Sequence, residues 1–153
     1  MEVVMKKLLL VVVMLSVVCF AFSQEAVQAK LVKLGIKTVQ TASNPSPTIQ
    51  KIYKFKENNL DGGIIVFTLK DLRIDVFATV MRTSAGFVVQ SIEPVNANAF
   101  NQERMGQLAD SFSWWNNVNA KSIPDVVSSA TRHSKGIYPE ISDAITAGIK
   151  ILQ

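Results

Sequence analysis

The segment from Asp125 to Thr131 holds residue types that could carry a chemical modification. It consists of an acid, two apolar residues, three small residues and a threonine, Asp125-Val126-Val127-Ser128-Ser129-Ala130-Thr131. Small side chains let a second molecule approach the backbone closely, and the hydroxyl of Thr131 is a nucleophile that another enzyme could modify. The same composition is also typical of a solvated turn before a helix. The residues alone therefore leave two interpretations, a modification site and a plain turn.

The pattern Asp125-x-x-Ser128-Ser129-Ala130-Thr131 resembles the flavinylation motif of FMN-binding domains, commonly Asp-x-x-Ser/Thr-Gly/Ser-Ala-Thr. Such domains occur in the flavin subunits of membrane NADH:quinone and ferredoxin:NAD oxidoreductases and in small exported flavoproteins. In that family the last threonine is joined to FMN through a phosphoester, which an FAD-dependent flavin transferase makes. The resemblance implies covalent FMN on Thr131. The cofactor-binding residues that it implies are Thr131, Ala130, Ser129, Ser128 and Asp125.

The resemblance is strongest over Ile123–Ile151. The segment differs from the family pattern at Ser129, where glycine is commonest, and at His133, where Ser or Thr is usual. The chain also lacks a counterpart of the Glu-Thr-Pro-Gly segment that often lies near the flavin in these domains. Asp125 is implied to help the transferase recognise the site, while the small residues keep the approach to Thr131 open.

His133 is the only histidine of the chain, and it stands close to Arg132 and Lys135. A lone histidine forms neither a catalytic triad nor a metal cage. The sequence has no His/Asp/Glu cluster with metal-ligand spacing, no P-loop and no dinucleotide fingerprint. We therefore expect no metal site. The resemblance implies an electron carrier rather than an enzyme with its own substrate. The three basic side chains either lie near a phosphate or are solvated loop charges.

Residues Met1–Ser23 have the pattern of a signal peptide. Lys6-Lys7 gives a positive start, and Leu8–Phe22 is an apolar stretch of the length of a signal-peptide core. This stretch is short for a transmembrane helix, which needs about 20 apolar residues. Small residues in Ala21-Phe22-Ser23 predict cleavage after Ser23. An uncleaved membrane anchor is the alternative.

The sequence after residue 23 is long enough for one domain, residues 24–153, with a modest core. The only cysteine, Cys19, follows Val18, where a lipobox needs Gly, Ala or Ser, so we expect no lipidation and no disulfide. The whole chain carries a net charge of +4; removing Lys6-Lys7 and Glu2 subtracts +2 and −1 and leaves +3. Without a Lys/Arg run, this charge does not indicate nucleic-acid binding. A periplasmic or extracellular location is the better interpretation.

Period-two patterns in the middle of the chain predict an antiparallel sheet of about four strands between Ile49 and Ile92. The expected strands are Ile49–Lys56, Ile64–Leu69, a half-buried strand from Leu72 to Val80, and Phe87–Ile92. The expected turns are Asn58–Gly63 and Thr83–Gly86, and Glu93-Pro94 is expected to end the sheet. Thr41–Thr48, with two prolines, is expected to be a loop.

Helical spacing predicts three helices around this sheet. The first is Gln24–Lys37, with Lys30 and Lys33 opposite its apolar side. We expect this helix to pack on the sheet, and the alternative is a helix that binds a membrane surface or a partner. The second runs from Asn101 to about Ser113. The third opens at Tyr138-Pro139-Glu140, because proline suits the first helical position. It should pack on the sheet and anchor the preceding motif. Trp114-Trp115 either fills the core or stacks on a flavin ring, and Ile123-Pro124 should be extended.

Together these features predict one small α+β domain behind a signal peptide. Through the resemblance, the chain is expected to be an exported flavoprotein that carries FMN covalently on Thr131 and relays electrons. Its expected partners are a flavin transferase and redox proteins that the sequence does not name, with membrane association left open. Alternatively, it is an exported binding or structural module without flavin, in which Asp125–Thr131 is only a turn.

Overall fold

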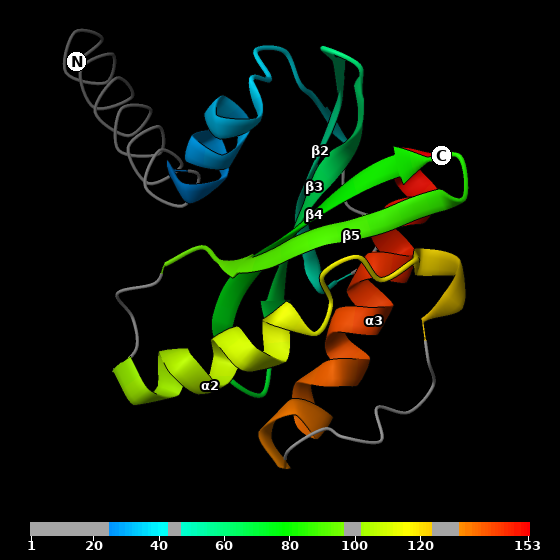
Figure 1. Cartoon of the computed structure of the whole chain (residues 1–153). Coiled ribbons are helices and arrows are strands. Elements are labelled where there is room, and N and C mark those ends of the chain that lie inside the picture. The colour runs from blue at the N-terminus through cyan, green and yellow to red at the C-terminus, as the bar shows by residue number, and fades with distance from the viewer. Residues whose placement is uncertain (1–24, 43–46, 97–101, 124–131) are drawn as a thin grey trace, which may run out of the picture.

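A single antiparallel sheet forms the centre of the protein. The computed structural model describes residues 25–42, 47–96, 102–123 and 132–153. Five strands lie in the order β1-β2-β3-β4-β5, each paired with the next along the chain. The N-terminal helix covers one face of this sheet, and α2 and α3 cover the other (Figure 1). The predicted α+β class and antiparallel meander are confirmed, with five strands in the described residues rather than about four.

The strands are β1 Gln40–Ala42, β2 Ile49–Glu57, β3 Leu60–Leu69, β4 Ile74–Thr83 and β5 Gly86–Pro94. Two of the three residues of the short edge strand β1, Thr41 and Ala42, fall where a loop was predicted. Its residues are exposed or half-buried, and it pairs through its backbone with β2, from Gln40 opposite Lys54 to Ala42 opposite Ile52. Such a strand needs no alternating apolar pattern, which is why the sequence did not reveal it. Residues 43–46 of the predicted loop lie outside the described residues.

The turn between β2 and β3 is shorter than predicted. Only Asn58 and Asn59 form it, with φ of 53° and 64°, the left-handed values that a two-residue type I′ hairpin requires. Gly62 and Gly63, predicted to belong to this turn, lie inside β3. A Cβ on Gly63 would lie 2.6 Å from Leu152 Cδ2 and 2.7 Å from a backbone oxygen of β2, so glycine allows α3 to approach the sheet closely.

Strand β4 is buried on both faces at its centre, so the prediction of a half-buried strand was wrong. Val76 and Val80 are 0% exposed on the side of α2 and α3, while Phe77 and Thr79 are 2% and 0% exposed. Phe77 belongs to the second apolar cluster, which the N-terminal helix covers. Because Thr79 is polar, the sequence pattern did not reveal that both faces of β4 are buried.

The N-terminal helix, described over residues 25–34, packs on the sheet as predicted. Val27 and Leu31 are 2% and 3% exposed, and Leu34 is half-buried beside them. Lys33 is exposed, but Lys30 is turned toward β5 rather than away from the sheet, which corrects its predicted placement. The segment Met1–Ser23 lies outside the described residues.

The second predicted helix is confirmed as α2, Gln102–Ser113, with Leu108 and Phe112 buried against the sheet. A 3₁₀ turn, η2, follows at Ala120–Ser122. The last helix, α3, spans Arg132–Leu152 and so begins before the predicted Tyr138-Pro139-Glu140 start.

Pro139 lies inside α3 rather than at its first position. A proline inside a helix removes one backbone hydrogen bond and crowds the preceding turn. Burial upstream of it offsets this cost, because Ile137 is only 3% exposed and belongs to the main core. The buried apolar residues of α3 therefore begin before Pro139. The sequence analysis had predicted that the helix starts at this proline.

Candidate functional site

The predicted cofactor-binding residues all lie outside the described part of the chain. They are Asp125, Ser128, Ser129, Ala130 and Thr131. Ile123 is the last described residue before them, and Arg132, where α3 begins, directly follows Thr131 in the sequence. The structure thus defines what the motif is attached to on each side.

The upstream attachment is the segment 114–123, which is fastened to strand β5. The backbone N–H of Val89 donates to the carbonyl of Val118 at 2.9 Å, and that of Asn117 donates to the carbonyl of Val89 at 2.8 Å. The Asn119 side chain adds a bond from Nδ2 to the carbonyl of Ala85, at 3.1 Å. Ile123 has φ −64° and ψ 118°, so it is extended as predicted. The chain therefore leaves the sheet edge at a fixed position.

The downstream attachment is α3, which packs on β3. Ile141 and Ile145 are fully buried in the main core. Gly148 lies against Ile65 of β3, with no room for a Cβ between them. A glycine at this contact lets the axis of α3 lie close to the sheet, and close packing holds the helix in one position. The prediction that the last helix packs on the sheet is confirmed.

Polar contacts hold α3 at Glu140, within the helix, and at its C-terminal end. Glu140 Oε2 accepts a hydrogen bond from the backbone N–H of Lys70 at 2.8 Å, between β3 and β4. At the C-terminal end of α3, Arg82 Nη2 donates to the carbonyl oxygen of Leu152 at 3.2 Å. A cation there also suits the negative end of the helix dipole. Arg82 is held in turn by Asp61, at 3.1 Å between Nε and Oδ2.

An aromatic cluster joins the segment after α2 to α3. Trp115 is 1% exposed and stacks on Tyr138, with ring centroids 4.9 Å apart and planes 26° apart. Trp114 is half-buried and makes edge contacts with both rings, at 5.3 Å to Trp115 and 5.5 Å to Tyr138. Of the two roles predicted for the tryptophan pair, core filling is confirmed for Trp115. Sequence reasoning missed Tyr138, because it treated this residue only as part of a helix start.

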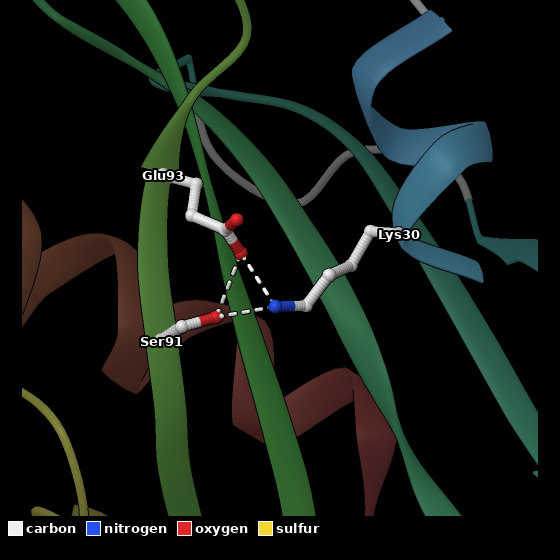
Figure 2. Close-up of polar contacts among 3 residues, drawn as sticks. All are labelled: Lys30, Ser91 and Glu93. Atoms are coloured by element: carbon white, nitrogen blue, oxygen red, sulfur yellow. Dashed lines mark hydrogen bonds and ion pairs between the residues drawn. The ribbon is translucent and has the colours of Figure 1, made fainter. Parts of the chain in front are cut away.

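A polar cluster on the other face ties the N-terminal helix to β5. Lys30 Nζ lies 2.7 Å from Glu93 Oε2 and donates to Ser91 Oγ at 3.1 Å. Ser91 Oγ donates in turn to Glu93 Oε2 at 2.9 Å, so the three groups satisfy one another (Figure 2). This arrangement positions the helix over the sheet, and it leaves none of the three groups poised as a separate acid or base.

Among the described residues, the side chains of Tyr53 and Glu57 have shifted pKa values. Burial raises the pKa of the Tyr53 phenol, and that residue lies in the cluster under the N-terminal helix. Two backbone N–H groups, of Lys37 and Thr38, lower the pKa of the exposed Glu57 carboxyl by donating to it at 2.8 Å and 3.1 Å. Both shifts follow from the packing of the N-terminal segment and indicate no catalytic pair.

Within the described ranges, no three His, Cys, Asp or Glu side chains gather in a way that could hold a metal ion. None of the described helices is long and apolar enough to cross a membrane.

Comparison with known proteins gives no assignment, because no family model, no curated protein and no solved structure matches the chain. The resemblance of Asp125–Thr131 to the flavinylation motif stays a prediction.

Proposed function

We propose that this protein is an exported flavoprotein that carries FMN on Thr131 through a phosphoester and relays electrons at the outer face of the membrane or in the periplasm. The observation that carries the proposal is the sequence Asp125-x-x-Ser128-Ser129-Ala130-Thr131 placed directly before α3, which begins at Arg132. The helix α3 supports this proposal, because a tether restrains its cofactor only if the residue that bears it is attached to a rigid element.

The start of α3 suits a phosphoester on the preceding residue. The first backbone N–H groups of a helix have no acceptor within the helix, and the helix dipole favours negative charge there. Anionic phosphate groups therefore bind well at helix N-termini. The sequence adds positive charge nearby through Arg132 and Lys135. The small residues before Thr131 let a transferase bring its flavin donor up to the threonine. Asp125 helps the transferase recognise the site.

The hydroxyl of Thr131 is the only group of this chain that reacts during attachment. Its oxygen forms a bond to the phosphorus on the FMN side of FAD, the bond between the two phosphates breaks, AMP leaves, and the hydroxyl proton passes to a base of the transferase. When bound, FMN supplies one- and two-electron transfer through its isoalloxazine ring, which this linkage leaves free. The chain itself then contributes tethering and orientation.

A covalent link has a clear advantage outside the cytoplasm. A flavin that dissociates there is lost, whereas a tethered one keeps a high effective concentration whatever its intrinsic affinity. The signal-peptide pattern of Met1–Ser23 supports this location, and the mature chain would begin near Gln24. N-terminal sequencing checks this point: an intact Met1 on a soluble cytoplasmic form contradicts export, and an intact Met1 on a membrane-bound form indicates an uncleaved anchor.

The proposal is tested by co-expression with an active flavin transferase, followed by a denaturing gel viewed under ultraviolet light. Wild type should show a fluorescent band only when the transferase is active, because only covalent flavin survives denaturation. Asp125→Ala should lower the yield of labelled protein. A wild-type band that stays dark beside an active transferase overturns the proposal and leaves the alternative, an exported binding or structural module.

A further inference from the structure

Polar bonds attach the N-terminal helix to the sheet at two separate places. The helix is described over residues 25–34 and ends at Gly35, which has a φ of 74°. The Gly35 carbonyl accepts a hydrogen bond from Asn58 Nδ2 at 2.9 Å, so this end is attached to the turn between β2 and β3. Nearer the start of the helix, Lys30 bonds to the side chains of two β5 residues (Figure 2). The helix therefore lies across the sheet, from the β2–β3 turn to β5.

Few apolar side chains add to these bonds. Of the described helix residues, only Val27 and Leu31 are almost fully buried, at 2% and 3% exposure. Helix α3, on the opposite face, buries a longer series of apolar residues, which are Ile137, Ile141, Ala144, Ile145, Ile149 and Leu152. Stabilisation by burial grows with the apolar area removed from water. The N-terminal helix is therefore held less strongly than α3, and an element of this kind can open locally while the rest stays folded.

A buried hydroxyl without a partner lies on the face of the sheet that the N-terminal helix covers. Thr79 stands opposite Ile64 of β3 and Ser91 of β5, and directly opposite residues of antiparallel strands share a face. Ile64 belongs to the second apolar cluster, under the helix. The Thr79 hydroxyl has no hydrogen-bond partner in the described structure. Such a group costs free energy while it is buried, and water removes the cost once it can reach the group.

We propose that the N-terminal helix is a lid that opens over its face of the sheet while the sheet itself stays folded. The bonds of Lys30 to Ser91 and Glu93 favour the closed position. The buried hydroxyl of Thr79 favours the open position. The lid turns at Gly35, whose left-handed backbone separates the helix from the chain that leads to β1. Opening exposes the second apolar cluster to water. None of these residues belongs to the candidate flavin site, so the lid is independent of the proposed function.

Hydrogen exchange of backbone amides distinguishes a lid from a fixed part of the core. The amides of residues 29–34 report opening of the helix, and those of residues 64–67 in β3 report unfolding of the sheet. A substitution that affects only the closed position changes the exchange of both sets, whereas one that weakens the closed and open forms equally changes only the β3 set. In wild type, the helix amides should exchange about tenfold or more faster than the β3 amides, after correction for intrinsic rates.

Lys30→Met removes the charge but keeps an unbranched side chain of similar helix propensity. It should speed exchange of the helix amides roughly tenfold, because hydrogen bonds of a charged group are lost. Lys33→Met is the matched control, since Lys33 is an exposed lysine of the same helix, and it should leave the rate unchanged. Thr79→Val removes the unsatisfied hydroxyl and should slow exchange of the helix amides about fivefold.

Gly148→Ala tests whether the helix opens without the sheet. Gly148 packs on Ile65 from the face of α3, so the substitution weakens the closed and the open form alike. Exchange in β3 should become faster, and exchange in the helix should not. Ile145→Val, which leaves a small cavity on the same face, is used if Gly148→Ala fails to fold. Glu93→Gln is used in the same way if Lys30→Met fails to fold.

The lid is contradicted if the helix amides and the β3 amides of wild type exchange at one rate. It is also contradicted if Gly148→Ala speeds both sets equally, or if Lys30→Met and Thr79→Val leave the helix amides at the wild-type rate.

Discussion

Gly148 of α3 lies directly against the buried side chain of Ile65 on β3. A Cβ added to Gly148 would overlap Cδ1 of Ile65 and lie 2.8 Å from its Cγ1. Ile65 is 0% exposed and surrounded by the main core, so it has no space to move into. The position of α3, and with it the residue that follows the motif, therefore depends on a glycine in the helix interior.

Gly148→Ala should destabilise the protein although alanine is the better helix former. Overpacking of a core typically costs about 1–3 kcal/mol, while replacing glycine in a helix returns up to about 1 kcal/mol. The measurement is the free energy of unfolding from denaturant titration. Gly106→Ala on α2 is the control, since an added Cβ there meets nothing within 4 Å, and it should stabilise by about 0.5–1 kcal/mol. Equal effects of the two substitutions would contradict the close packing of α3.

The hydroxyl of Thr79 is buried without a hydrogen-bond partner in the described structure. Thr79→Val removes this unsatisfied group at nearly constant shape, so it should stabilise the protein by about 1 kcal/mol. Thr68→Val on β3 provides the contrast, because Thr68 Oγ1 accepts from Gln50 and donates to Asp75 at 2.8 Å each. That variant should lose stability. A loss in Thr79→Val as large as in Thr68→Val would show that Thr79 has a partner in solution.

Glu57 should make stability depend on pH in the acid range. Its folded pKa is lowered, chiefly by the backbone N–H groups of Lys37 and Thr38. The unfolded chain therefore takes up a proton at a higher pH than the folded one. The stabilisation is complete above the ordinary glutamate pKa and is lost as the pH falls through the lowered folded value.

Glu57→Gln removes this dependence. Denaturant midpoints of wild type and variant should differ at neutral pH and converge as the pH falls well below the ordinary glutamate range. The effect is small, because the carboxylate is fully exposed. A difference that grows toward acid pH would have the opposite sign and would contradict the assigned hydrogen bonds.

The sequence was sufficient for the elements that bury a regular apolar stripe. The approximate positions of the strands from β2 to β5 and of the helix α2 were predicted from their apolar residues, as with Leu108 and Phe112 of α2. Prediction from the sequence failed where the interaction that determines the structure is not visible in a local sequence pattern. Strand β1 pairs with β2 through its backbone and packs only Ala42 against the main core. Gly62-Gly63 looks like a turn in the sequence, although the close approach of β4 and α3 requires these glycines inside β3.

The flanks of the candidate site were predicted less completely than the sheet. The proline rule placed the start of α3 too late, because burial of Ile137 outweighs the lost hydrogen bond at Pro139. The stacking of Trp115 on Tyr138 joins residues from two separate elements, so no single stretch of sequence contains it. The candidate motif, Asp125–Thr131, was identified through its resemblance to a flavinylation motif, whereas its residue types alone also fit a plain turn.

The most direct test of the central claim is peptide mass spectrometry on protein co-expressed with a flavin transferase. Trypsin cuts after Lys121 and Arg132, so it releases residues 122–132, which contain the hydroxyls of Ser122, Ser128, Ser129 and Thr131. This peptide should gain the mass of FMN less one water, and fragmentation should place it on Thr131. Thr131→Val keeps the shape of the side chain without its nucleophilic oxygen, and should yield only the unmodified peptide from a folded protein. An unmodified wild-type peptide, or FMN still covalently bound in Thr131→Val, would contradict the assignment.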